Sequence, residues 1–237
     1  MSYINLNPTI FEGSDCDYKL VPSDWADNPI TVYENWISDA TVAQLRATTE
    51  ANLQHGICNL GYTRDGGGVY MPQFRRSADI NASFYPATVW QDITRAMLRA
   101  AIDRYGAIYG PDTPEVQSGS HSFTTVYKKE AAVLGLHSDG GTQVNGVWRA
   151  SVTTRYEMSG LLYLTTAGVD FDGGALVFPY LAETNGNAIT YYPRAGDLVV
   201  FPANPLFSHR VDRSNGERIV MGAWRAWRPY SFARQGR

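Results

Sequence analysis

The chain has 237 residues, and 44% of them are hydrophobic, which is enough to bury a sizeable core. Its net charge is −3 and its pI about 5.8, so nucleic acid is a poor candidate partner. The two cysteines, Cys16 and Cys58, exclude a disulfide framework.

Neither a leader nor a membrane span is evident in the sequence. Residues Met1–Phe11 contain neither the basic nor the apolar stretch of a secretory leader, and no apolar run is long enough to cross a bilayer. We therefore expect a soluble, cytoplasmic protein without a membrane partner.

Two helices are expected in residues 1–116. The first runs from about Asp39 to His55, with Ser38 as its N-cap and Gly56 after its end. The second begins after Pro86, and its apolar residues recur at helical spacing: Trp90, Ile93, Met97, Ala101, Ile102 and Tyr105, followed by Gly106. This part of the chain is expected to be a helical and loop support region.

From residue 117 onward, short strands separated by turns are expected. They are His121–Lys128, Ala132–His137, Ser151–Arg155, Gly160–Thr165, Ala175–Pro179, Ala188–Tyr192, Asp197–Pro202, Phe207–Val211 and Arg218–Trp227. No helical crossover interrupts them, which favours a sandwich or barrel. The sequence predicts a mainly β (α+β) fold, a double-stranded β-helix (jelly roll) over residues 117–237. The N-terminal helices would support it within one integrated domain.

His137 and Asp139 are the first residues with a chemical signature. On an extended segment, residues i and i+2 project to the same face, so both side chains can reach one ion. A distant His209 would complete two imidazoles and one carboxylate, a set that leaves iron(II) with open coordination positions. On these three residues alone, a turn histidine and an ordinary strand histidine are equally good interpretations, and several metals fit.

Arg218 strengthens the metal interpretation. If a hairpin is centred on Arg213 and Ser214, His209 and Arg218 are cross-strand partners with Cβ atoms about 5 Å apart. The segment after Arg218 is apolar enough to be buried on both faces. A buried guanidinium needs an anionic partner, and a bound diacid could supply one.

Several motifs, in order along residues 117–227, resemble the 2-oxoglutarate/iron(II) oxygenases, and most closely their prolyl 4-hydroxylase-like branch. The motifs are Tyr127, His137-x-Asp139, Leu161-Leu162-Tyr163-Leu164, Gly173-Gly174-Ala175-Leu176-Val177-Phe178, Gly196-Asp197-Leu198-Val199-Val200-Phe201, His209 and Arg218. The resemblance implies an enzyme that uses Fe(II), O2 and 2-oxoglutarate, with ascorbate as a possible stimulant. It would release succinate and carbon dioxide while hydroxylating a substrate.

The resemblance also implies roles for individual residues. His137, Asp139 and His209 would hold the metal, and Arg218, Tyr127 and Tyr163 would bind 2-oxoglutarate. Trp224 is placed like a tryptophan near the substrate of the oxygen-sensing prolyl hydroxylases. Related halogenases have a small residue where this chain has Asp139, so the carboxylate indicates hydroxylation.

The chain departs from the oxygen-sensing enzymes in two segments. Lys128-Lys129-Glu130 replaces a glycine-rich turn, and the stretch after Asp139 is longer, with Gly140–Ala150 as the excess. We expect Gly140–Ala150 to be a mobile lid, with an exposed Trp148 or Arg149 touching the substrate. The alternatives are a plain hairpin whose Trp148 packs on the sheet, and selectivity residing near Arg75 and Arg76.

Other functions remain open at this point. A small molecule, an amino acid or related metabolite, is the expected substrate, and a prolyl residue in a peptide is the alternative. A zinc hydrolase fits poorly because H-E-x-x-H is absent, and a nucleic-acid demethylase would need an arginine at Trp224. A non-catalytic jelly-roll module that binds a small ligand is the alternative of another class.

Overall fold

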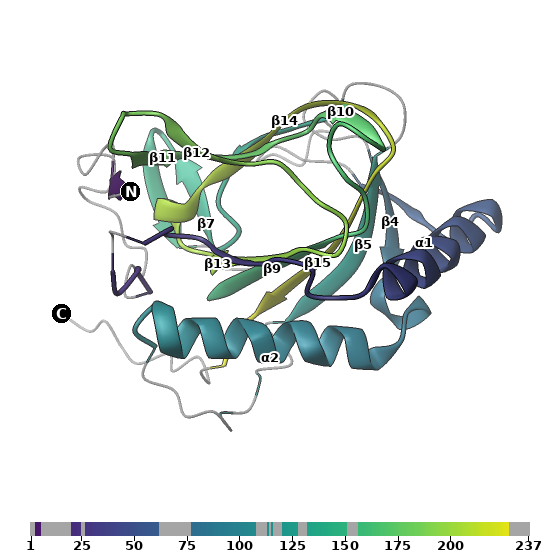
Figure 1. Cartoon of the computed structure of the whole chain (residues 1–237). Coiled ribbons are helices and arrows are strands. Elements are labelled where there is room, and N and C mark those ends of the chain that lie inside the picture. The colour runs from purple at the N-terminus through teal and green to yellow at the C-terminus, as the bar shows by residue number, and fades with distance from the viewer. Residues whose placement is uncertain are drawn as a thin grey trace.

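The computed structural model shows two antiparallel sheets that face each other across a common interior, with helices outside the larger sheet (Figure 1). The described residues are 3–5, 20–24, 27–61, 77–107, 113, 115, 120–127, 132–150 and 156–227. This is the expected double-stranded β-helix, and the prediction of the fold class is confirmed. The expected boundary near residue 117 lies outside the described residues, and so does the strand expected at 151–155.

The larger sheet has seven described strands and forms the middle layer in Figure 1. Its order is β2 (Thr31–Tyr33), β13 (Leu198–Pro202), β9 (Met158–Tyr163), β15 (Arg218–Arg225), β5 (His121–Tyr127), β4 (Ser77–Asn81) and β3 (Asn59–Gly61). Three of these strands, β2, β3 and β4, come from the N-terminal half, where only helices and loops were predicted. That half therefore supplies sheet as well as support.

The smaller sheet lies on the other side of the interior. Its path is β1 (Tyr3–Asn5), β11 (Leu176–Glu183), β14 (His209–Gly216) and β10 (Phe171–Gly173), while β12 (Ala188–Tyr191) pairs with β11 and β6 (Ala132–His137) pairs with β14. A separate hairpin consists of β7 (Gly141–Val144) and β8 (Val147–Ala150). Three-residue strands such as β1 and β10 give too short a pattern to be found in the sequence.

Both predicted helices are confirmed. Helix α1 (Asp39–Gln54) begins at Ser38, whose hydroxyl accepts a hydrogen bond from the Thr41 amide at 3.3 Å, and Gly56 follows it with φ +68°. Helix α2 (Ala87–Arg104) follows Pro86 and lies against the outer face of the larger sheet (Figure 1). None of the described helices has both the length and the apolar character needed to cross a membrane.

The contact between α2 and β9 defines which side chains point into the interior. A Cβ at Gly160 would lie 2.8 Å from Met97 Sδ on α2, so Gly160 faces the helix. Because side chains alternate along a strand, Ser159 and Tyr163 face the interior instead.

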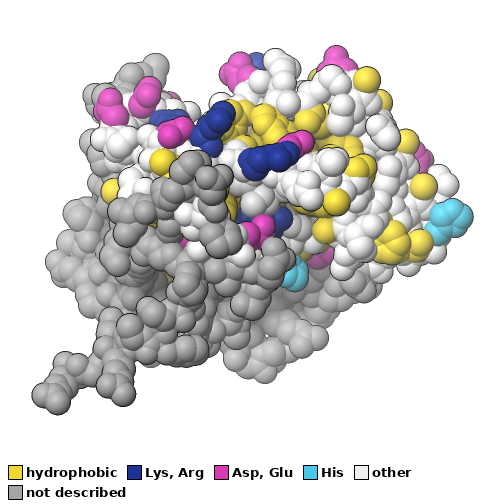
Figure 2. Space-filling view, turned by 90° about the horizontal axis from the view of Figure 1, so that it is seen from below, with side chains coloured by type: hydrophobic (Ala, Val, Ile, Leu, Met, Phe, Trp, Pro, Cys, Tyr) yellow, Lys and Arg dark blue, Asp and Glu magenta, His cyan; other side chains and the backbone are white. Residues whose placement is uncertain are grey.

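The outer surface that carries α2 also has a groove of about 870 Å³, where arginines and aspartates lie among apolar side chains (Figure 2).

The predicted hairpin between His209 and Arg218 is wrong. Strand β14 continues to Gly216 and pairs with β10, β11 and β6 of the smaller sheet, whereas β15 pairs with β5 and β9 of the larger one. The chain does not turn at Arg213 and Ser214 because these residues extend alongside β10. His209 and Arg218 therefore lie on opposite sheets, and both are buried.

The strand predicted from Phe207 begins two residues later, at His209. Pro205–Phe207 form a 3-10 turn, which is capped by the Asn204 side chain accepting from the Leu206 amide at 3.0 Å. The turn directs the chain into the interior immediately before His209.

Candidate metal centre

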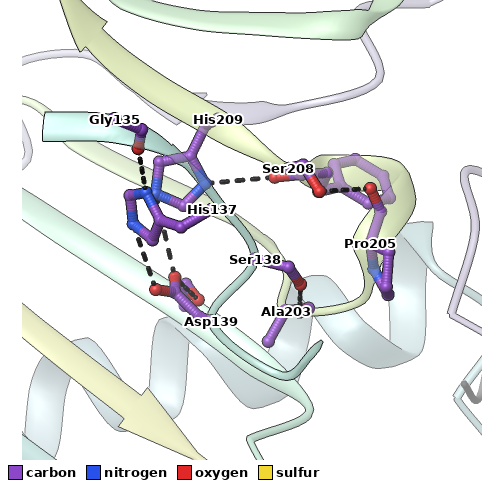
Figure 3. A network of polar contacts seen from close by, with 10 residues as sticks. Gly135, His137, Ser138, Asp139, Ala203, Pro205, Ser208 and His209 are labelled. Atoms are coloured by element: carbon purple, nitrogen blue, oxygen red, sulfur yellow. Dashed lines mark hydrogen bonds and ion pairs between the residues drawn. The ribbon is translucent and has the colours of Figure 1, made fainter. Parts of the chain in front are cut away.

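The two candidate histidine ligands lie on neighbouring strands of the smaller sheet. His137 ends β6, His209 begins β14, and the two residues are opposite each other in the register of the pair. Asp139 lies two residues after His137, and its carboxylate points at both rings (Figure 3). The His137 Nε2 atom is 3.7 Å from Asp139 Oδ1, and the His209 Nε2 atom is 4.0 Å from Oδ2.

The three side chains offer one ligand atom each, and these atoms lie within 4.8 Å of one another. The two nitrogen–oxygen separations of 3.7 and 4.0 Å suit a single ion between these atoms, since metal–nitrogen and metal–oxygen bonds of about 2 Å place two ligand atoms up to roughly 4 Å apart. Two imidazoles and one carboxylate on one side would leave the opposite coordination positions open. The described residues therefore fit an iron(II) site.

Each ligand is held by a second contact. The Nδ1 atoms of His137 and His209 lie 2.8 Å from the Gly135 carbonyl and 3.1 Å from the Phe207 carbonyl. A carbonyl oxygen can only accept, so Nδ1 carries the proton in both rings and Nε2 keeps the lone pair that a metal needs. Ser159 on β9 donates to Asp139 Oδ2 at 2.6 Å, which connects the carboxylate to the larger sheet.

The loop that carries Asp139 is fixed by its backbone. The Ser138 hydroxyl donates to the Ala203 carbonyl at 2.8 Å (Figure 3), and the Gly140 amide donates to the same carbonyl at 2.8 Å. A Cβ at Gly140 would lie 2.8 Å from the carbonyl oxygens of Ala203 and Tyr156, so this position requires glycine. The sequence indicated only a turn at Gly140, because its neighbours are distant in the chain.

The charges in the centre favour metal binding. Burial raises the pKa of the Asp139 carboxyl, but His209 and His137 lower it more, helped by Ser159 and Trp224, and the net shift is downward. Burial lowers the pKa of His209 to about 4, and His137 contributes to the same shift. An ionised carboxylate beside a neutral imidazole is the protonation state that a metal ligand set needs.

Aromatic rings fix the orientation of His209. The Phe201 ring centroid is 5.0 Å from the His209 ring and that of Phe178 is 5.7 Å from it. The two phenylalanines also pack edge to face at 5.1 Å. This apolar shell keeps water away from one side of the centre. The sequence gives no sign of it, because both residues look like ordinary core.

The second half of the site surrounds Arg218 on β15. Its side chain is 1% exposed, and its Cζ lies 5.2 Å from the centroid of the Tyr127 ring and 5.4 Å from that of Tyr163. In the described part of the chain, Arg218 Nε and the Tyr163 hydroxyl have no hydrogen-bond partner, and no carboxylate is paired with the guanidinium.

A buried charge without a counter-ion is costly, so this arrangement points to an anionic ligand. Burial raises the pKa of the Tyr163 hydroxyl, although Arg218 opposes the shift, and the phenol remains a donor at neutral pH. A guanidinium fork and a phenol can together bind one carboxylate. These residues therefore fit one carboxylate of an anionic ligand.

Trp224 forms an aromatic wall beside Asp139. Its ring stacks on Phe123 with centroids 4.9 Å apart and lies 6.2 Å from the Tyr156 ring. The indole covers Gly222, where a Cβ would lie 2.4 Å from the Trp224 ring. Trp224 is opposite Ser159 in the sheet register, so the wall adjoins the carboxylate ligand.

Gly140–Ala150 contains a β-hairpin, with Asn145 and Gly146 at its turn with φ of 51° and 79°. The lid interpretation required an exposed Trp148. The residue is instead only 2% exposed, and its ring packs edge-on to Tyr180 with centroids 6.5 Å apart. Arg149 is exposed on the neighbouring position. Arg75 and Arg76, the alternative location of selectivity, lie outside the described residues, and so does the Lys128–Glu130 segment.

Comparisons with known proteins agree with this geometry. Residues 123–226 match the model of the 2OG-Fe(II) oxygenase superfamily, and no curated protein sequence is significantly similar to the chain. A prolyl-4-hydroxylase from Pseudomonas putida is 20% identical, with a TM-score of 0.59 over 84% of this chain and 93% of that one.

Two further structures share the fold. A Trichoplax adhaerens prolyl hydroxylase, solved with a hypoxia inducible factor peptide, is 14% identical, with a TM-score of 0.60 over 84% of this chain and 83% of that one. The non-heme alpha ketoglutarate dependent epimerase SnoN from nogalamycin biosynthesis is 13% identical, with a TM-score of 0.52 over 86% and 82%. Over residues 123–226 the chain therefore matches the 2OG-Fe(II) oxygenase superfamily, its His137, Asp139 and His209 could hold the iron of such an enzyme, and its fold is that of prolyl 4-hydroxylases.

Proposed function

We propose that the protein hydroxylates an unactivated C–H bond of a small molecule, an amino acid or related metabolite. The observation that carries this proposal is the pairing of two incomplete sites in one interior. The three-ligand cluster has an open side, and the buried Arg218 has no counter-ion among the described residues. One molecule of 2-oxoglutarate would complete both sites, because it carries a metal-chelating oxo acid at one end and a carboxylate at the other.

In this proposal, His137, Asp139 and His209 hold iron(II), and the metal with 2-oxoglutarate and O2 supplies the oxidising chemistry. Ser159 keeps the Asp139 carboxylate in the orientation that serves the metal. Because Asp139 occupies a coordination position, no room is left there for a halide, and hydroxylation is the expected outcome.

Arg218 and Tyr163 bind the distal carboxylate of 2-oxoglutarate, and the Tyr127 ring packs against the guanidinium. The guanidinium gives two parallel hydrogen bonds to a carboxylate, which fixes direction as well as charge. Phe178 and Phe201 exclude water beside His209. These residues orient the reactants but leave the bond-making to the metal.

The wall formed by Trp224, Phe123 and Tyr156 is proposed to contact the substrate, since it adjoins Asp139. Such a wall suits an apolar or ring-shaped group. An amino acid side chain is the first choice. A prolyl residue of a peptide is the second, and the fold shared with a prolyl hydroxylase that was solved with a peptide favours it.

The metal assignment is tested by changing each ligand. His137→Ala, Asp139→Ala and His209→Ala should each abolish succinate release from 2-oxoglutarate, with the melting temperature changed little because an open-sided catalytic metal does not hold the core. His55→Ala, at the exposed end of α1, is the matched control and should keep full activity. Full turnover by His209→Ala would remove the proposed metal site.

The substrate is sought by measuring succinate release across a panel of free amino acids and proline-containing peptides. Stimulation by a free amino acid would support the small-molecule assignment, and stimulation by peptides alone would replace it with the peptide alternative. A jelly-roll module without catalysis would bind 2-oxoglutarate but release no succinate with any of them.

A further inference from the structure

A second buried carboxylate, Asp197, lies inside the barrel next to the Arg218 pocket. Asp197 immediately precedes β13 and is 2% exposed. Its neighbour Leu198 is opposite Leu162, which shares the outward face of Gly160, so Asp197 points inward. The backbone also places it beside Tyr163, whose amide donates to the Asp197 carbonyl at 3.0 Å.

Tyr191 on β12 approaches Asp197 from the smaller sheet. Its hydroxyl donates to Asp197 Oδ2 at 2.7 Å, while the Asn35 amide donates to Oδ1 at 2.9 Å. Tyr191 is on the same face of β12 as Ile189, whose partner Phe178 packs inside the barrel. The carboxylate thus holds the phenol in place across the interior.

The Tyr191 ring also packs beside Tyr163, which lines the proposed cosubstrate pocket. The ring centroid of Tyr191 is 5.7 Å from that of Tyr163, and Tyr163 is the ring 5.4 Å from the Arg218 guanidinium. Successive contacts therefore link Arg218 to Tyr163, Tyr163 to Tyr191, and Tyr191 to Asp197. The Tyr191 ring, with the Asp197 carboxylate bound to it, thus adjoins one wall of the pocket proposed for the distal carboxylate.

We propose that Tyr191, held by Asp197, ends the cosubstrate pocket and selects 2-oxoglutarate over longer 2-oxo diacids. This inference rests on the proposed function, because it assumes that Arg218 binds the distal carboxylate. A six-carbon diacid such as 2-oxoadipate would carry its carboxylate one methylene further, toward the Tyr191 ring. It would also approach Asp197, and like charges in a low-dielectric interior repel strongly.

The hydrogen bond from Tyr191 to Asp197 restricts movement of the Tyr191 ring at the end of the proposed pocket. A tyrosine without this bond could swing aside and admit the longer chain. With the bond, movement of the ring would leave a buried carboxylate without one of its donors, which is unfavourable. Tyr191 is therefore a specificity-determining residue, and Asp197 is a positioning residue that acts through it.

The test measures binding and does not depend on turnover. The dissociation constants of 2-oxoglutarate and 2-oxoadipate are determined by calorimetry on the Mn(II)-loaded protein, and anaerobically on the Fe(II) protein from the visible charge-transfer band. In Tyr191→Leu, which opens the end of the pocket, the preference for 2-oxoglutarate should fall by about tenfold or more, the usual effect of one methylene in a fitted pocket. Tyr192→Leu is the matched control, since Tyr192 is 64% exposed, and it should keep the wild-type preference.

Asp197→Asn provides a second variant that keeps the shape while removing the charge. It should relax the preference by a smaller factor than Tyr191→Leu, and it decides the question if Tyr191→Leu does not fold. If folded variants at both positions kept the wild-type preference for 2-oxoglutarate over 2-oxoadipate, the proposal that Tyr191 ends the pocket would be overturned, while 2-oxoglutarate binding would remain in place. Absence of 2-oxoglutarate binding in the wild-type protein would instead remove the proposed function, and the inference with it.

Discussion

Strand β15 carries two buried arginines, one at each end, and their surroundings are opposite. Arg225 is 5% exposed and forms a 3.0 Å ion pair with Glu115. It also donates to Thr94, Ser122 and the carbonyls of His121 and Trp224 at 2.6–2.9 Å. Arg218 is 1% exposed and has two tyrosine rings beside it, but its Nε has no acceptor in the described part of the chain.

The difference separates structure from function on one strand. Arg225 is satisfied by the protein itself, so its charge contributes to holding α2, β5 and β15 together. Among the described residues, Arg218 has no carboxylate partner, and burying such a charge is costly. Binding of an anion would offset that cost, which is why an incompletely satisfied buried charge is a better marker of a ligand site than a buried charge alone.

The largest effect is expected from removing the satisfied arginine. Arg225→Met should lower the free energy of unfolding by about 3 kcal/mol, because Glu115 and several buried acceptors lose their donor together. Denaturant unfolding monitored by circular dichroism measures the change. A loss below about 1 kcal/mol would mean that water replaces the guanidinium easily, and the contrast with Arg218 would weaken.

Removing the unsatisfied arginine should have the reverse pattern. Arg218→Met is expected to leave the ligand-free melting temperature unchanged or higher, and to weaken 2-oxoglutarate binding by about a hundredfold. Arg218→Lys keeps the charge but loses the planar fork, so it should raise the apparent Michaelis constant for 2-oxoglutarate more than that for the substrate. An unchanged requirement for 2-oxoglutarate in both variants would exclude Arg218 as the anchor.

The comparison also shows how far the sequence could be interpreted. His137 and Asp139 were found because alternation along a strand is a local rule that needs no knowledge of the fold. Arg218 was expected to be buried because the segment after it is apolar, and it is buried, but it was placed beside His209 through a hairpin that does not exist. The stretch from Arg213 to Gly216 has a turn-like composition, yet it extends alongside β10, and only tertiary pairing decides between these alternatives.

Other parts of the site leave no local signal. Ser159 supports Asp139 from a position 20 residues away in sequence, and Tyr191 meets Tyr163 from the opposite sheet. The burial of Trp148 depends on Tyr180, which belongs to another strand. Contacts of this kind are set by how the two sheets face each other, and composition and periodicity do not report them.

A smaller effect is expected at the contact that joins the metal centre to the larger sheet. Ser159→Ala removes the hydrogen bond to Asp139 and should weaken iron(II) binding by about tenfold, the lower end of the range for residues that support a ligand. The apparent affinity is measured by titrating the apoprotein with iron(II) under anaerobic conditions. Ser83→Ala, at an exposed serine before α2, is the control. Equal iron(II) affinities in the two variants would show that Ser159 does not affect iron(II) binding.

The smallest effect concerns the β7–β8 hairpin, where the expected lid and the observed packing make different predictions. Trp148 is buried against Tyr180, so Trp148→Ala should lower the melting temperature and reduce every activity in proportion. Arg149 is exposed, and Arg149→Ala should leave the melting temperature unchanged. If Arg149 contacts the substrate, hydroxylation should fall several-fold while decarboxylation of 2-oxoglutarate without substrate persists. Measuring succinate and hydroxylated product separately distinguishes the cases, because a hairpin with a structural role alone would leave their ratio unchanged in both variants.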